Sequence, residues 1–216
     1  MPPARYWVVT NNLSPWTREI YDLLQEVASK RVPGLEQNFQ TQASILGGLL
    51  LLIWVLEIID FLLFQGALNR YGIRPRSLRG LSGIFLAPFL HGSFKHLAAN
   101  TVPLVTLGWL VMLQDIHYFF VVTAVTVLVS GFGVWLFGAS RSVHLGASGL
   151  IFGYLGFLLL YGYFERSLWT GMISLFVGLF YGGMIWGILP SRQGVSWQGH
   201  LFGFVGGILA ARLLSQ

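Results

Sequence analysis

Six long apolar segments constrain the fold of this chain more than any other feature. They lie near residues 44–64, 94–113, 118–138, 148–163, 169–189 and 199–214. A helix needs about 20 apolar residues to cross roughly 30 Å of hydrocarbon, and most of these segments approach that length. Only 10% of the residues are charged, whereas a soluble domain carries roughly 25%. The sequence therefore predicts an all-α membrane protein, a bundle of six transmembrane helices in contact with the lipid bilayer.

The polar N-terminal stretch, residues 1–43, is predicted to lie outside the membrane, ahead of a membrane domain at residues 44–216. Ser14 and Pro15 are typical of a helix N-cap and first helical position. Pro33 and Gly34 are predicted to end this helix. It is expected to be short and amphipathic, because apolar residues recur at helical spacing on one face. They are Ile20, Leu23, Leu24, Val27 and Ala28.

Composition also limits the partners and cofactors of the chain. The net charge is +5, and the arginines are scattered rather than grouped with aromatic residues. We therefore expect no nucleic-acid partner. The chain has no cysteine, which excludes disulfides and thiolate metal sites. No motif calls for a cofactor, and no feature of the sequence specifies an oligomeric state.

Four polar side chains stand out because they lie near the start of an apolar span. His96 and Asn100 begin the second span, Ser148 begins the fourth, and His200 begins the sixth. Polar residues inside a membrane are costly, and they usually serve function. Because consecutive spans alternate in direction, the second, fourth and sixth begin on the same side of the membrane. The topology thus predicts a common depth for these four residues.

Glycine spacing predicts that the fourth and sixth spans touch. Small residues four apart form a helix face that lets two backbones approach closely in lipid. Contact between two such faces would bring His200 within hydrogen-bond reach of Ser148. A hydroxyl next to a base is the arrangement that nucleophilic catalysis requires. The glycines are Gly149 and Gly153 in the fourth span, and Gly199, Gly203 and Gly207 in the sixth.

His96 and Asn100 are four residues apart and share one helix face. Both can donate hydrogen bonds in their neutral forms. They suit the stabilisation of a developing oxyanion, together with the backbone N–H of Ser148. The N-terminal end of the fourth helix adds a partial positive charge at the same place.

Taken in order, these motifs resemble the rhomboid family of intramembrane serine proteases. The resemblance covers roughly residues 44–214 and includes the segment Tyr71-Gly-Ile-Arg-Pro-Arg76. The motifs that carry it are His91 with His96-Leu-Ala-Ala-Asn100, then Gly146-Ala-Ser148-Gly149, then Gly199-His200 followed by Gly203.

The resemblance implies a catalytic dyad of Ser148 and His200 without an acidic third member. It implies an oxyanion site at His96 and Asn100, and a ring of Phe152 stacked on the catalytic histidine. Gly146 and His91 are expected to line the site. The implied substrates are single-span transmembrane proteins, and the implied location is the bacterial inner membrane, crossed several times.

The orientation is drawn from the resemblance, which implies that both termini lie in the cytoplasm. The distribution of lysines and arginines predicts the opposite orientation. Most of those in the membrane domain lie near the helix ends that carry the four polar residues, and positively charged loops usually lie in the cytoplasm. We follow the resemblance, because arginines buried against carboxylates in the first loop are not free loop charges.

Several other readings remain open from the sequence alone. Ser148 could simply cap its helix, and the chain could be a catalytically silent rhomboid-like scaffold. Glu57 and Asp60 could form the proton path of a transporter, although we expect them to pair with Arg74 or Arg76. Four histidines could bind a metal, although no His-Glu-x-x-His motif is present. They are His91, His96, His200 and His144, the last of which is expected at the entrance of the site.

Overall fold

A computed structural model of the chain describes residues 14–190 and 195–215. Five of its helical segments are long and apolar enough to cross a membrane: Asn38–Phe64, Phe94–Gln114, Ile116–Phe137, Ser148–Glu165 and Leu168–Ile188. The chain is therefore an all-α, multi-pass membrane protein. The helices are α2 (Pro15–Ile59), α4 (Phe94–Gln114), α5 (Ile116–Phe137), α6 (Ser148–Glu165), α7 (Leu168–Tyr181) and α8 (Trp197–Leu214).

The sixth predicted span corresponds to α8, which has 18 residues. It is not among the five segments that are apolar enough to be recognised as spans. Gln198, His200 and Arg212 lower its hydropathy. A membrane crossing by α8 therefore stays a prediction.

The N-terminal helix differs from its prediction. The chain forms two compact units, residues 1–44 and 45–216, and α2 runs unbroken from Pro15 to Ile59. The predicted end at Pro33 is wrong. A proline removes one helical hydrogen bond, and good helix formers such as Leu35 and Glu36 follow it. The side chains of Leu23, Leu24, Val27 and Ala28, which were to form the amphipathic face, lie outside the described part.

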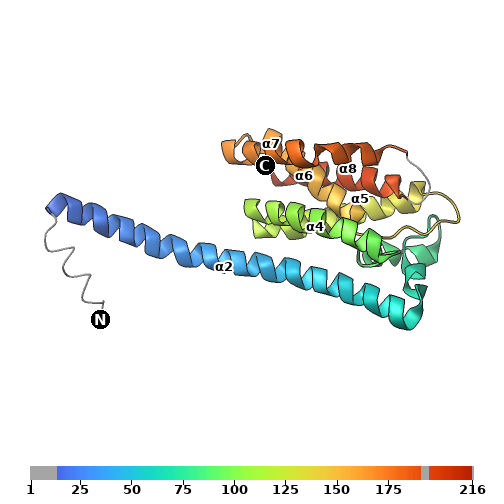
Figure 1. Cartoon of the computed structure of the whole chain (residues 1–216). Coiled ribbons are helices and arrows are strands. Elements are labelled where there is room, and N and C mark those ends of the chain that lie inside the picture. The colour runs from blue at the N-terminus through green and yellow to red at the C-terminus, as the bar shows by residue number, and fades with distance from the viewer. Residues whose placement is uncertain (1–13, 191–194, 216) are drawn as a thin grey trace. The chain divides into compact units, whose positions relative to one another are not determined.

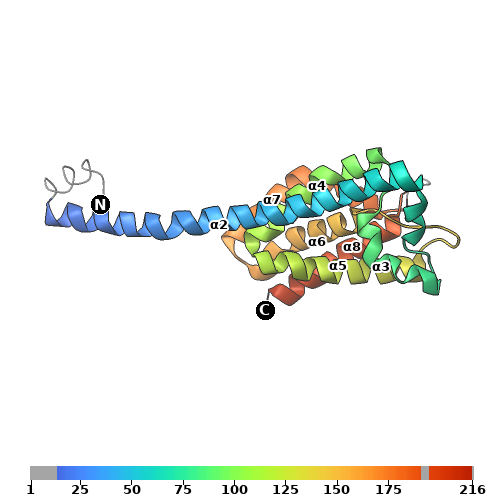
Figure 2. The same cartoon turned by 90° about the horizontal axis from the view of Figure 1, so that it is seen from below.

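Within residues 45–216, α6 lies at the centre and packs against α4, α5, α7 and α8 (Figures 1 and 2). The contact between α6 and α8 depends on glycine. A Cβ atom on Gly203 would collide with the carbonyl oxygen of Gly149, and one on Gly207 would collide with that of Gly153. The predicted glycine-mediated contact between the two helices is thus confirmed, and it places the start of α8 beside the start of α6.

The first loop packs against the protein. After the π-helical turn η1 (Asp60–Phe64) come the 3-10 turns η2 (Ala67–Tyr71) and η3 (Leu78–Gly80), helix α3 (Gly83–Leu86) and the 3-10 turn η4 (Ala87–Phe89). Ile84 of α3 is 3% exposed, and it lies where a side chain on Gly131 of α5 would be. The backbones of Ile73 and His144 exchange two hydrogen bonds of 2.8 and 2.9 Å. The loop is thereby fixed to the segment that precedes α6.

The predicted pairing of Glu57 and Asp60 with arginine is wrong. In the described segments, no ion pair joins either carboxylate to Arg74 or Arg76. The Asp60 carboxylate accepts a hydrogen bond of 2.9 Å from the backbone N–H of Leu68. The Arg76 guanidinium donates instead to carbonyl oxygens at the end of α5, where helical carbonyls lack partners and a positive charge is favourable. Its acceptors are Leu136 O at 2.7 Å, Gly138 O at 3.0 Å and Ser140 Oγ at 2.7 Å.

Candidate active site

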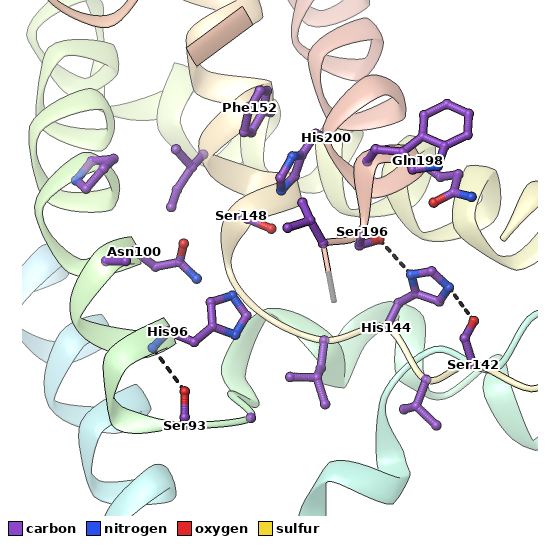
Figure 3. A pocket seen from close by; sticks show the side chains of 18 of the residues that line it. Ser93, His96, Asn100, Ser142, His144, Ser148, Phe152, Ser196, Gln198 and His200 are labelled. Carbon is purple, nitrogen blue, oxygen red and sulfur yellow. Dashed lines mark hydrogen bonds between the residues drawn. The ribbon is translucent and has the colours of Figure 1, made fainter. Parts of the chain in front are cut away.

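A cavity of about 920 Å³ opens between the first turns of α4, α6 and α8 and the loop before α6. Its wall includes all four predicted polar side chains, His96, Asn100, Ser148 and His200, together with Phe152. In Figure 3 the Ser148 side chain lies between His200 on one side and Asn100 and His96 on the other. The structure thus brings together residues that are up to 104 positions apart, from His96 to His200.

Ser148 is the first residue of α6, and Ala147 occupies the cap position. No hydrogen bond joins the Ser148 hydroxyl to any residue in the described part of the chain. The alternative in which Ser148 serves as a helix cap is therefore wrong. Its hydroxyl faces the cavity at the positive end of a helix, where a negative charge is favourable.

His200 is held in place on two sides. Its ring stacks on that of Phe152, with 4.1 Å between centroids and an interplanar angle of 6°. Its Nδ1 atom lies 2.9 Å from the carbonyl oxygen of Gly187. A carbonyl only accepts hydrogen bonds, so Nδ1 carries the proton and Nε2 keeps the lone pair that a base needs. Gly187 belongs to the 3-10 turn η5 (Gly182–Ile188), which continues α7.

His200 and Ser148 are not hydrogen-bonded to each other in the described structure. The two side chains line the same cavity and approach each other in Figure 3. Catalytic hydrogen bonds in unliganded enzymes are often long and shorten when substrate binds. The geometry is therefore compatible with a base–nucleophile pair in a resting state.

His91 lies behind the cavity wall rather than in it, which corrects its predicted place as a lining residue. It is 1% exposed. Its Nε2 atom lies 3.1 Å from the Asn100 amide nitrogen and 3.4 Å from the backbone N–H of Ala147. Both neighbours are donors, so Nε2 must accept and the ring must be neutral. Burial, with a smaller effect of nearby His96, lowers the pKa of His91 to about 4, which keeps it neutral.

The acceptor role of His91 fixes the direction of Asn100. One hydrogen of the Asn100 amide is directed to His91, so its nitrogen is identified, and its second hydrogen remains available to the cavity. His96 packs edge-on against His91, with 5.1 Å between ring centroids. A buried histidine thus orients the donor that the sequence assigned to oxyanion stabilisation.

Gly146 lies next to His96 and, like His91, is not among the residues that line the 920 Å³ cavity. Its φ angle is +112°, a conformation that residues with a side chain rarely adopt. A Cβ atom there would lie 2.7 Å from Cε1 of His96. Both the backbone shape and the close approach of His96 therefore require glycine at this position.

A second set of polar residues connects the loop to α8. It joins His144, which lines the cavity as expected, to Ser142 and Ser196, which the sequence did not single out. Ser142 Oγ donates to Ala139 O at 2.6 Å and lies 2.7 Å from His144 Nε2. Ser142 must therefore accept from Nε2–H, which leaves Nδ1 to accept from Ser196 Oγ at 2.7 Å. Ser196 in turn caps α8 by accepting from the Gly199 N–H at 3.4 Å. Burial lowers the pKa of His144 and favours this neutral chain.

His144 thus positions the first turn of α8, from which His200 projects. Replacement of His144 by leucine should lower kcat about tenfold by letting that turn shift, because small displacements at an active site are costly. The matched control is His117→Leu, since His117 is exposed and its side chain makes no hydrogen bond to any described residue. The proteolysis that the resemblance implies provides the assay, and its rates in the two purified variants test the role. Equal rates for His144→Leu and the parent protein would contradict it.

The cavity lacks the residues for a metal site. In residues 14–190 and 195–215, no three histidine or carboxylate side chains lie close enough to hold a metal ion. Three of the four histidines that were considered as metal ligands contact other protein groups instead. The partners are Asn100 for His91, Ser142 and Ser196 for His144, and Gly187 and Phe152 for His200.

Comparison with known proteins covers the part of the chain that forms the cavity. The family model of the Rhomboid domain matches residues 78–216, which include the whole cavity. The uncharacterized proteins Rv1337 of Mycobacterium tuberculosis and Mb1372 of Mycobacterium bovis are each 45% identical over 172 residues, covering 76% of this chain and 71% of theirs. ML1171 of Mycobacterium leprae is 43% identical over 172 residues, with coverage of 76% and 68%. The chain belongs to the rhomboid family.

Proposed function

We propose that this protein is an intramembrane serine endopeptidase that cuts the transmembrane segments of single-span membrane proteins. One observation carries the proposal: the Ser148 hydroxyl, which is hydrogen-bonded to no described residue, shares a cavity with His200. The Nδ1–H of His200 is directed to Gly187, which leaves Nε2 as a base. Membership of a family that includes proteases supports it, and the mycobacterial relatives make a bacterial inner membrane the proposed location.

In the proposed reaction, Nε2 of His200 takes the Ser148 proton as the hydroxyl oxygen attacks the scissile carbonyl carbon. Negative charge then develops on the carbonyl oxygen, where Asn100, His96 and the Ser148 backbone N–H can donate hydrogen bonds. The protonated His200 gives its proton to the leaving amine, and an acyl-enzyme remains on Ser148. Water, activated by His200, releases the acyl group and regenerates the hydroxyl.

The hydrogen-bonded pair of Ser196 and His144 is a second nucleophile candidate, because its 2.7 Å contact has the geometry of a base–hydroxyl pair. Three features favour Ser148. Ser196 is engaged as the N-cap of α8, His144 donates to Ser142 rather than to a rigid carbonyl, and Asn100 is directed towards the side of the cavity where Ser148 lies. We therefore assign Ser196 and His144 to positioning.

Replacement of Asn100 by alanine should lower kcat by about 10²-fold, which is typical of the loss of one oxyanion donor. Ser148 should still react with a fluorophosphonate, although more slowly, because the nucleophile and base are intact. Steady-state cleavage of a single-span substrate by purified protein measures the first effect, and labelling measures the second. Unchanged kcat in Asn100→Ala would remove Asn100 from the oxyanion site.

The missing Ser148–His200 hydrogen bond gives one reason to consider a catalytically silent rhomboid-like scaffold that binds membrane helices. A panel of single-span proteins separates the two functions. The protease cleaves at least one of them in a reaction that requires Ser148, whereas a scaffold binds without cleavage. A chelator should leave the cleavage rate unchanged, because the proposed chemistry uses no metal.

A further inference from the structure

Two arginines share a second cavity beside the catalytic one. Arg74 and Arg141 line a space of about 330 Å³ together with Pro75, Ser77, Ser142 and Val143. The Nε atom of Arg74 is buried and has no hydrogen-bond partner in the described residues. Neither guanidinium forms an ion pair or hydrogen bond in that part of the chain. Arg74 is half-buried, whereas Arg141 is exposed. A half-buried cationic group without a partner is unfavourable, unless an anion joins it.

Neighbouring arginines of the first loop are used differently. Arg76 holds the end of α5 through three acceptors. Arg70 donates to the Tyr71 hydroxyl at 3.0 Å, and its guanidinium lies 4.9 Å from that ring's centroid. Arg79 is exposed and lies outside the second cavity. Arg74 and Arg141 thus place positive charge, which no described residue neutralises, at one open surface cavity.

The acidic residues of the membrane unit leave this charge uncompensated. Residues 45–216 contain four carboxylates. Glu57 and Asp60 are buried, at 7% and 4% exposure. Asp115 and Glu165 lie at the last turns of α4 and α6, at the opposite end of those helices from the cavity. No exposed carboxylate of this unit is therefore available at the arginine end.

The second cavity is joined to the catalytic one by a shared wall. Ser142 and Val143 line both. The surrounding backbone is fixed, because Ile73 pairs with His144 and because Gly80 lies against the backbone of Arg74. An extended chain that reaches Ser148 can therefore continue over Val143 and place a side chain between the two arginines.

We propose that Arg74 and Arg141 form an anion subsite that binds the carboxylate of an acidic residue in the substrate, just outside the membrane and next to the cleaved segment. This inference rests on the proposed protease function and adds a rule for substrate choice. The wall shared with the catalytic cavity favours a substrate side chain over a lipid headgroup, because it places the subsite along the path of the bound chain. Guanidinium groups suit carboxylates through paired N–H donors.

The test uses the full-length protein in vesicles of phosphatidylcholine and a single-span substrate that it cleaves. Three versions of the substrate carry Glu, Gln or Lys immediately outside the membrane on the active-site side. We expect kcat/KM to be roughly five- to tenfold higher for the Glu version than for the Lys version. Arg74→Gln with Arg141→Gln should remove this preference, and Arg74→Glu with Arg141→Glu should reverse it. Arg79→Gln, the matched control from the same loop, should keep it.

The outcomes separate this inference from the proposed function. Absence of Ser148-dependent cleavage for every version would overturn both. Cleavage of all three versions at one rate would overturn the anion subsite and leave the protease in place. If added phosphatidylglycerol changed cleavage of all versions equally, and only when Arg74 and Arg141 were present, the arginines would belong to a lipid phosphate site and the inference would be wrong.

Discussion

Ser148→Ala and His200→Ala should each lower the cleavage rate by about 10⁴-fold or more, while the protein remains folded. The first change removes the nucleophile and the second removes its base, and members of such a pair act as a unit. The double variant should therefore be no slower than either single variant. Cleavage of a single-span substrate by protein purified in detergent measures the rates, and thermal unfolding checks the fold.

His117→Ala is the matched control for the histidine, because the exposed His117 side chain makes no hydrogen bond in the described structure. Its rate should equal that of the parent protein. A Ser148→Ala protein that kept a tenth of the parent activity would show that another group is the nucleophile, with Ser196 as the first candidate because of its 2.7 Å contact with His144.

The second large effect is expected at a residue that takes no part in the chemistry. Gly203→Ala should lower activity by about 10²-fold, and Gly203→Leu should prevent a stable fold. Even the single Cβ atom of alanine would meet the carbonyl oxygen of Gly149. Separation of α6 and α8 would move His200 away from Ser148, and a shift of about 1 Å can cost roughly 10²-fold in rate.

Gly48→Ala is the control for the glycine variant, because nothing lies within 4 Å of a Cβ atom built on Gly48. It should behave like the parent in both activity and thermal unfolding. Normal activity in Gly203→Ala would mean that the two helices can separate without moving the pair, and the positional argument would fail.

The packing around the candidate site was predictable, because the identities of single residues indicate it. Glycines four apart mark a helix face in any sequence, and Gly203 and Gly207 indeed lie against Gly149 and Gly153. Polar residues in apolar spans are equally visible. The order of the spans then places His200 and Ser148 at one end of the bundle without further information.

The partners of these residues were not predictable, because many of them are backbone atoms. The Gly187 carbonyl that fixes the tautomer of His200 has no signature in the sequence. The same holds for the carbonyls at the end of α5 that hold Arg76. His144 and Ser196 are 52 residues apart, and neither lies in a motif. The predicted helix end at Pro33 failed for a different reason. A single local signal, the proline, was given too much weight, and the helix continues through it.

Covalent labelling tests the central claim most directly. The protein is treated with a fluorophosphonate, digested, and the modified residue is identified by mass spectrometry. The proposed mechanism predicts one adduct on Ser148, its absence in Ser148→Ala and much slower formation in His200→Ala. An adduct on Ser196 or Ser142 would contradict the assignment of Ser148 as the nucleophile. Continued cleavage of a substrate by protein that is fully labelled at Ser148 would contradict it as well.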